Sequence, residues 1–89
     1  MTEAQQIAKI KSALGIGAGI PDDTISVWLT DAKDFMLKAG VPISVINADT
    51  TIGTLTRGVS DLWNYGSGDT GFSTVFEKRV AQLALGNKK

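Results

Sequence analysis

Two glycine-rich segments are the first candidates for chemistry, because backbone N–H groups in such loops can bind phosphate. A nucleotide-binding loop follows a strand with a defined glycine spacing, or ends in Gly-Lys-Ser/Thr. Residues 15–19 follow a predicted helix and match neither pattern. Residues 66–71 hold one carboxylate, Asp69, whereas a calcium loop needs several oxygen ligands. We therefore interpret both segments as connectors between helices and predict no cofactor and no metal ion.

Four carboxylates share one predicted helix, and paired carboxylates can act as acid and base when their environments separate their pKa values. Asp22 and Asp23 stand at the helix start, where negative charge interacts favourably with the helix dipole. Asp31 and Asp34 lie off the apolar stripe of the same helix, on the side expected to face solvent. Helix capping and surface charge explain all four, so we assign them no catalytic role.

The sequence contains no histidine and no cysteine. Their absence removes Ser/His/Asp and Cys/His nucleophile systems, zinc-finger spacings and disulfides. A Ser/Lys pair is compatible with the composition, but no spacing in the chain indicates one. We therefore predict that the protein is not an enzyme.

Charge and hydropathy argue against nucleic-acid readout and membrane insertion. Nine Lys and Arg residues balance nine Asp and Glu residues, whereas a protein that neutralises several phosphates usually has a basic excess or stripe. No apolar run reaches about 18 residues, and the first ten residues are polar, without the apolar segment of a signal peptide. The length of 89 residues and the 43% hydrophobic content predict one folded domain over residues 1–89.

Helical periodicity dominates the first half of the chain. The first predicted helix covers residues 2–14, with Thr2 and Gln5 at capping-box spacing. The second starts at Pro21 and ends at Gly40. Its apolar stripe consists of Ile25, Trp28, Leu29, Ala32, Phe35, Met36 and Ala39. Residues 41–47 fit a short extended piece or a helical turn, and we expect an irregular segment that buries its apolar side chains.

Two further helices are predicted in the second half. The third begins near Asp49 or Thr50, and its stripe consists of Ile52, Leu55, Val59, Leu62 and Trp63. Gly53 and Gly58 within it each cost about 1 kcal/mol relative to alanine. They mark either a close approach of a neighbouring helix or glycines that a well-packed helix tolerates, and we favour tolerance. The fourth helix has capping-box spacing at Thr74 and Glu77, and its shared face consists of Phe76, Val80, Leu83 and Ala84.

These patterns predict an all-α fold, a small bundle of about four helices with two glycine-rich connecting loops. Most aromatic residues fall on the inward stripes, so we expect them in the core. Tyr65 and Phe72 flank the second glycine-rich segment and fit either the core or an interface with a partner.

An ordered set of residues resembles a known family. Ser60-Asp61-Leu62-Trp63-Asn64-Tyr65, then a glycine-containing loop, Phe72-Ser73 and Gln82-Leu83, resemble the small head–tail connector proteins of long-tailed bacteriophages. The closest similarity is to their QLRG-type DNA-packaging branch, although Ala84-Leu85-Gly86 replace the Arg-Gly part of that motif. Asp22-Asp23, followed by Ile25 and Ala32, resembles the usual opening of these proteins after a short first helix.

The resemblance implies a structural protein that acts by assembly. Such proteins are made in the host cytoplasm and form a ring, typically a dodecamer, below the portal at the head–tail junction of the virion. The ring extends the DNA channel and docks the tail or a stopper protein, and DNA passes through as cargo without sequence readout. The expected partners are further copies of the chain, the portal protein and a tail or stopper protein. The candidate interface residues are Val27, Ile43, Tyr65, Phe72 and Val75.

Two alternatives remain open. The first is a small helical DNA-binding regulator, but a helix-turn-helix needs a basic recognition helix. The second predicted helix carries Asp31 and Asp34, and the third has Arg57 as its only base. The other alternative is a different phage tail-completion factor of similar size.

Overall fold

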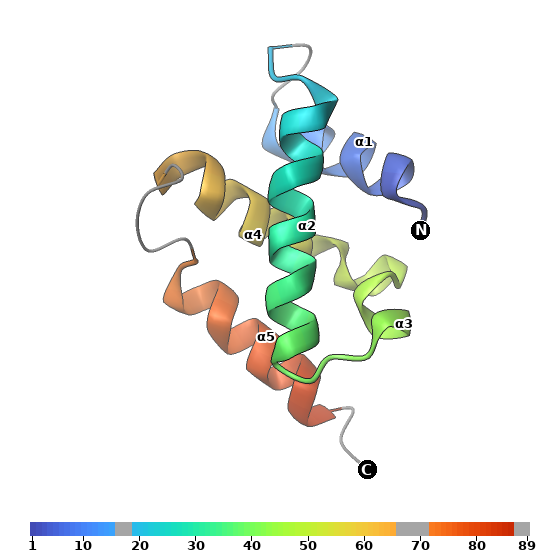
Figure 1. The fold of residues 1–89 in the computed structure, drawn as a ribbon, viewed down its shortest axis with the longest axis vertical. Coiled ribbons are helices and arrows are strands. Elements are labelled where there is room, and N and C mark those ends of the chain that lie inside the picture. The colour runs from blue at the N-terminus through green and yellow to red at the C-terminus, as the bar shows by residue number, and fades with distance from the viewer. Residues whose placement is uncertain (16–18, 66–71, 87–89) are drawn as a thin grey trace.

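The computed structural model describes residues 1–15, 19–65 and 72–86, and every regular element in those ranges is a helix (Figure 1). The elements in chain order are α1 (Glu3–Leu14), α2 (Asp22–Lys38), α3 (Ile43–Ile46), the short 3-10 helix η1 (Asp49–Thr51), α4 (Ile52–Tyr65) and α5 (Thr74–Gly86). The prediction of a small all-α fold is confirmed. The predicted connectors fall partly (residues 15–19) and wholly (residues 66–71, with Asp69) outside the described residues.

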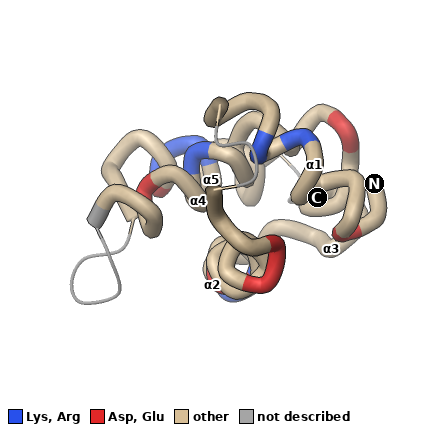
Figure 2. Tube along the Cα trace, turned by 90° about the horizontal axis from the view of Figure 1, so that it is seen from above, with Lys and Arg blue, Asp and Glu red and all other residues tan. Residues whose placement is uncertain are grey.

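The helices form two layers. α2 runs along the long axis of the molecule in Figure 1, and the view from above in Figure 2 shows it apart from the layer that contains α1, α4 and α5. α2 packs mainly across α4 and also contacts α1, while α5 packs against α4. One long face of α2 is therefore left open to solvent, next to α5.

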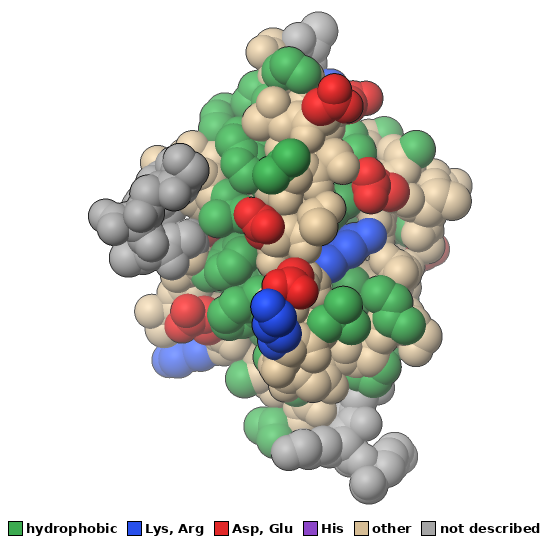
Figure 3. Space-filling model, in the orientation of Figure 1, with side chains coloured by type: hydrophobic (Ala, Val, Ile, Leu, Met, Phe, Trp, Pro, Cys, Tyr) green, Lys and Arg blue, Asp and Glu red, His purple; other side chains and the backbone are tan. Residues whose placement is uncertain are grey.

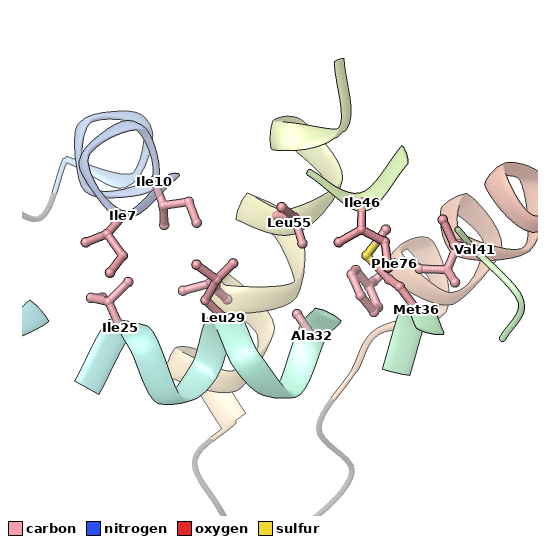
Figure 4. Close-up of a cluster of buried hydrophobic side chains, with 12 residues drawn as sticks. Ile7, Ile10, Ile25, Leu29, Ala32, Met36, Val41, Ile46, Leu55 and Phe76 are labelled. Atoms are coloured by element: carbon pink, nitrogen blue, oxygen red, sulfur yellow. The ribbon is translucent and has the colours of Figure 1, made fainter. Parts of the chain in front are cut away.

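The core lies between these layers. Its fully or nearly fully buried side chains are Ile7, Ile10, Ile25, Leu29, Ala32, Met36, Val41, Ile46, Leu55, Val59, Phe76 and Val80. Figure 4 shows side chains of α1 and α2 meeting at one end of this cluster, and Met36, Ile46 and Phe76 meeting at the other. Burial of one large aliphatic or aromatic side chain contributes about 1.5–3 kcal/mol, so these contacts supply most of the stabilisation.

Local signals set the ends of the first two helices as predicted. Thr2 caps α1 in a capping box, in which the Gln5 N–H donates to Thr2 Oγ1 (3.2 Å) and the Thr2 N–H donates to Gln5 Oε1 (2.9 Å). Gly15, with φ 69°, ends α1 in the left-handed conformation that glycine favours. Gly40, with φ 102°, follows α2 and turns the chain toward the buried Val41.

Residues 41–47 form a turn of helix rather than the irregular segment that we expected. Pro42 precedes α3, and its carbonyl accepts hydrogen bonds from the N–H groups of Val45 and Ile46, both at 3.0 Å. Val41 and Ile46 are buried, as expected, but Ile43 is exposed. The turn arises because proline is compatible with a helix start and because Ile46 must reach the core beside Met36.

The two glycines of α4 differ. A Cβ atom at Gly53 would meet nothing within 4 Å, so there the helix tolerates glycine as expected. At Gly58 a Cβ atom would lie 2.7 Å from Phe76 Cε1 and 3.0 Å from Ala32 Cβ. Our preference for tolerance is therefore wrong at Gly58, where α2, α4 and α5 approach too closely for any side chain.

Candidate interaction surfaces

Six large apolar side chains in the described part of the chain are exposed, with exposed fractions from 39% to 67%. They are Val27 and Leu37 on α2, Ile43 on α3, Trp63 on α4, and Val75 and Leu85 on α5. Single exposed apolar residues are normal in monomers. An inference about function must therefore rest on where these residues lie relative to one another and to other surface features. Val27, Ile43 and Val75 are predicted interface residues, and each is accessible to a partner.

Sequence reasoning missed Leu37, Trp63 and Leu85 as exposed residues. Leu37 and Leu85 lie outside the apolar stripes of their helices, and this spacing could have predicted their exposure. Trp63 was expected to point inward. It lies near the end of α4, where the described neighbours cover Leu62 but leave Trp63 39% exposed.

Phe72 belongs to an aromatic cluster. Its ring stacks on Phe76 with a centroid distance of 4.5 Å, and the Phe35 ring lies 5.1 Å from Phe72 and 5.6 Å from Phe76. Phe72 is half-buried, so the structure gives it a core contact while part of the ring still faces solvent. Its role at an interface stays a prediction. The side chain of Tyr65, the other predicted aromatic anchor, lies outside the described residues.

Two adjoining hollows, of about 590 and 440 Å³, run along the open side of α2. We call them together the α2 trough. The first is lined by Asp31, Asp34, Phe35, Lys38, Ala39, Leu62 and Phe72, and the second by Phe35, Ala39, Gly40, Glu77, Val80, Ala81, Ala84 and Leu85. Most of the lining is apolar, and three carboxylates stand among it. Figure 3 shows acidic side chains next to hydrophobic ones on this face.

A partly buried chain of hydrogen bonds joins α1 and α2 to Asn47, which follows α3. Lys33 Nζ donates to Gln6 Oε1 (2.5 Å), and Gln6 Nε2 donates to Asn47 Oδ1 (3.1 Å). Gln6 is fully buried, and these bonds satisfy its amide. Partial burial lowers the pKa of Lys33 from its ordinary value, and the nearby Glu3 carboxylate opposes that shift. Because every group has a partner, we interpret the chain as structural.

A second polar group joins α4 to the start of α5. Asp61 is almost fully buried, and its Oδ1 lies 3.3 Å from Arg57 Nε. Its Oδ2 accepts hydrogen bonds from the N–H and the hydroxyl of Ser73. The Ser73 hydroxyl oxygen in turn accepts from the Phe76 N–H (3.2 Å). Ser73 therefore caps α5, and our placement of the cap at Thr74 is wrong by one residue, because Asp61 holds Ser73 in position.

The described residues form exposed apolar positions and the α2 trough. The described residues contain no group of three or more acidic side chains that could hold a metal ion. In the same ranges, no helix has the length and apolar character needed to cross a bilayer. Comparison with family models, curated proteins and solved structures found no match for this chain.

Proposed function

We propose that the protein is a structural component of a phage virion, a head–tail connector that assembles into a ring below the portal. In this role the ring, a dodecamer by the family resemblance, extends the DNA channel at the head–tail junction. It also docks the tail or a stopper protein. DNA passes as cargo, in keeping with the balanced charge of the chain.

One observation carries the proposal: the accessible apolar surface is spread over several elements of a very small domain. Exposed apolar side chains stand on α2, α3, α4 and α5, and the α2 trough adds a hollow with a mostly apolar lining. A domain of this size buries a smaller share of its surface than a large one. The apolar side chains that stay outside its core are available for contacts with neighbouring proteins. A ring subunit needs contact surfaces on more than one side, because each copy touches two others.

The family resemblance supplies the identity of the partners. Its residues include Asp61 and Ser73, which join α4 to α5, and Ile25 and Ala32, which lie in the core. Part of the resemblance therefore rests on residues that shape the domain, and other residues that carry it, such as Trp63 and Gln82, are exposed.

Light scattering after size-exclusion chromatography, followed by negative-stain microscopy, tests the proposal. We expect rings with a central hole, formed by the protein alone or with the portal protein of the same phage. A chain that stays monomeric at every concentration and binds neither portal nor tail proteins would contradict the proposal. Salt-dependent binding to duplex DNA would instead favour the regulator alternative.

A further inference from the structure

We propose that neighbouring copies join through two unlike surfaces: the acidic α2 trough of one copy receives a basic face of α5 from the next. This inference rests on the self-assembly in the proposed function and specifies which surfaces make the contact. The occupant of the trough is thus a second copy of the same chain.

The α5 surface is a stripe on the side away from the core. Val75, Lys78, Arg79 and Gln82 are spaced at i, i+3, i+4 and i+7, so they share one helix face. All four are exposed, whereas Phe76 and Val80 on the inner side are buried. Among the described residues, Lys78 and Arg79 have no ion-pair partner. We call this set the α5 stripe.

The α2 surface presents the opposite charge. Val27, Asp31 and Asp34 are spaced at i, i+4 and i+7 on one exposed face, and the two aspartates line the trough. In the described part of the chain Asp31 has no ion-pair partner, and Asp34 pairs only with Lys38, at 2.9 Å. Both members of that pair are largely exposed, and such helix pairs contribute only about 0.3–0.5 kcal/mol. Asp34 can therefore exchange this partner for one from a neighbouring copy.

The two surfaces match in length and composition. Each covers seven steps of helix, from Val27 to Asp34 and from Val75 to Gln82, which is about 10 Å at 1.5 Å per residue, and each has one exposed valine and two like charges. Apolar contact of Val75 with the trough lining would supply affinity, and the opposite charges would set register and speed association. Contact between two α2 faces would oppose acid to acid, and contact between two α5 stripes would oppose base to base.

The positions of the surfaces decide the symmetry of the contact. The α2 trough opens on the α2 side of the molecule, whereas Figure 2 shows basic positions along the layer of α1, α4 and α5. Since the contact uses different surfaces on the two copies, it is heterologous, and its repetition produces a closed ring or a filament. This geometry is what a ring subunit requires.

Charge reversal on each surface gives a direct test. The trough variant carries Asp31→Lys and Asp34→Lys, and the stripe variant carries Lys78→Glu and Arg79→Glu. We expect either variant alone to self-associate at least about tenfold more weakly than wild type, which corresponds to about 1.4 kcal/mol. An equimolar mixture should recover assembly, because each reversed trough then meets a reversed stripe and each native trough a native stripe. The matched control, Asp23→Lys with Asp49→Lys, makes the same charge change outside the trough and should assemble like wild type.

Sedimentation velocity, with and without the portal protein, distinguishes the outcomes, and circular dichroism verifies the helicity of each variant. Recovery in the mixture also shows that both variants are folded. If wild type assembles and either variant assembles equally well alone, or if the mixture stays dissociated, this contact is wrong and the proposed function stands. If wild type neither assembles nor binds portal or tail proteins, both proposals are wrong.

Discussion

The carboxylate of Asp61 on α4 accepts two hydrogen bonds from Ser73, one from its N–H (2.9 Å) and one from its hydroxyl (2.8 Å). Ser73 caps α5, so one buried side chain determines where the last helix begins and how it meets α4. Arg57 supplies the opposite charge from one turn earlier on α4. The α5 stripe is therefore positioned through this polar group as well as through Phe76 and Val80 in the core.

Replacing Asp61 with alanine should lower the free energy of unfolding by about 1–3 kcal/mol, the usual penalty for a buried polar group left without its partner. The substitution leaves the Ser73 N–H without its acceptor and removes the carboxylate that pairs with Arg57. Urea denaturation measures the loss. Asp34→Ala, at an exposed position, is the control and should change stability by no more than about 0.5 kcal/mol. Equal effects of the two substitutions would argue against a structural role for Asp61.

Alanine substitutions at the two glycines of α4 should have opposite effects. Gly58→Ala places a methyl group 2.7 Å from Phe76 Cε1 and should destabilise the fold by about 1–3 kcal/mol through overpacking. Gly53→Ala enters open space and should stabilise it by up to about 1 kcal/mol through helix propensity. Thermal and urea unfolding of both variants measure the difference. A stable Gly58→Ala protein would show that α2 and α5 do not approach α4 as closely as the structure indicates.

Aspartate at the exposed valines should block assembly without unfolding the chain. Val27→Asp removes the apolar contact of the α2 face, and Val75→Asp removes the valine of the α5 stripe and places an acid opposite Asp31 and Asp34. We expect loss of rings in negative-stain images, with the far-ultraviolet circular dichroism unchanged. Leu37→Asp is the matched control, because Leu37 is exposed on α2 and does not line the α2 trough. Survival of the rings in both valine variants would exclude these residues from the interface.

Ile43 is tested separately from the valines, because it stands on α3, away from the surfaces of the proposed contact. If the α2 trough and the α5 stripe make the contact between copies, Ile43→Asp should leave the rings intact. It could still weaken binding of the portal or of the tail protein. A pull-down with each of those proteins, together with ring images, separates these roles. Loss of the rings themselves would place Ile43 between copies.

Lys33 should make stability rise with pH in the alkaline range. Burial lowers its folded-state pKa below the ordinary value of 10.5, so between those two values the unfolded chain binds more protons than the folded one. The free energy of unfolding therefore increases as pH rises through that window. Below the folded-state pKa, the cost of burying the charged Lys33 side chain is present in full. Lys33→Met keeps the length of the side chain and removes the titration. The free energy of unfolding of wild type minus that of this variant should increase as pH approaches 10.5. A difference that is independent of pH would contradict the prediction.

The sequence alone was sufficient for the features that depend on neighbouring residues along the chain. Thr2 with Gln5, Gly15 and Gly40 act through local hydrogen bonds and local backbone conformation, so the ends of α1 and α2 could be predicted. The apolar stripe of α2 likewise depends only on helical spacing. The exposure of Val27 and Val75 followed from their positions outside the predicted stripes, whereas Ile43 lies in a segment whose apolar side chains we expected to be buried.

Other features depend on contacts between residues far apart in sequence, and only the folded arrangement decides them. Gly58 must be glycine because Phe76 and Ala32 come from other helices to the same point. Ser73 caps α5 because Asp61, twelve residues earlier, holds it in place. The α2 trough exists because α5 packs on α4 beside the open face of α2, and no spacing within one helix encodes that relation. Local patterns therefore specify the helices, whereas packing between them specifies the surfaces available for assembly.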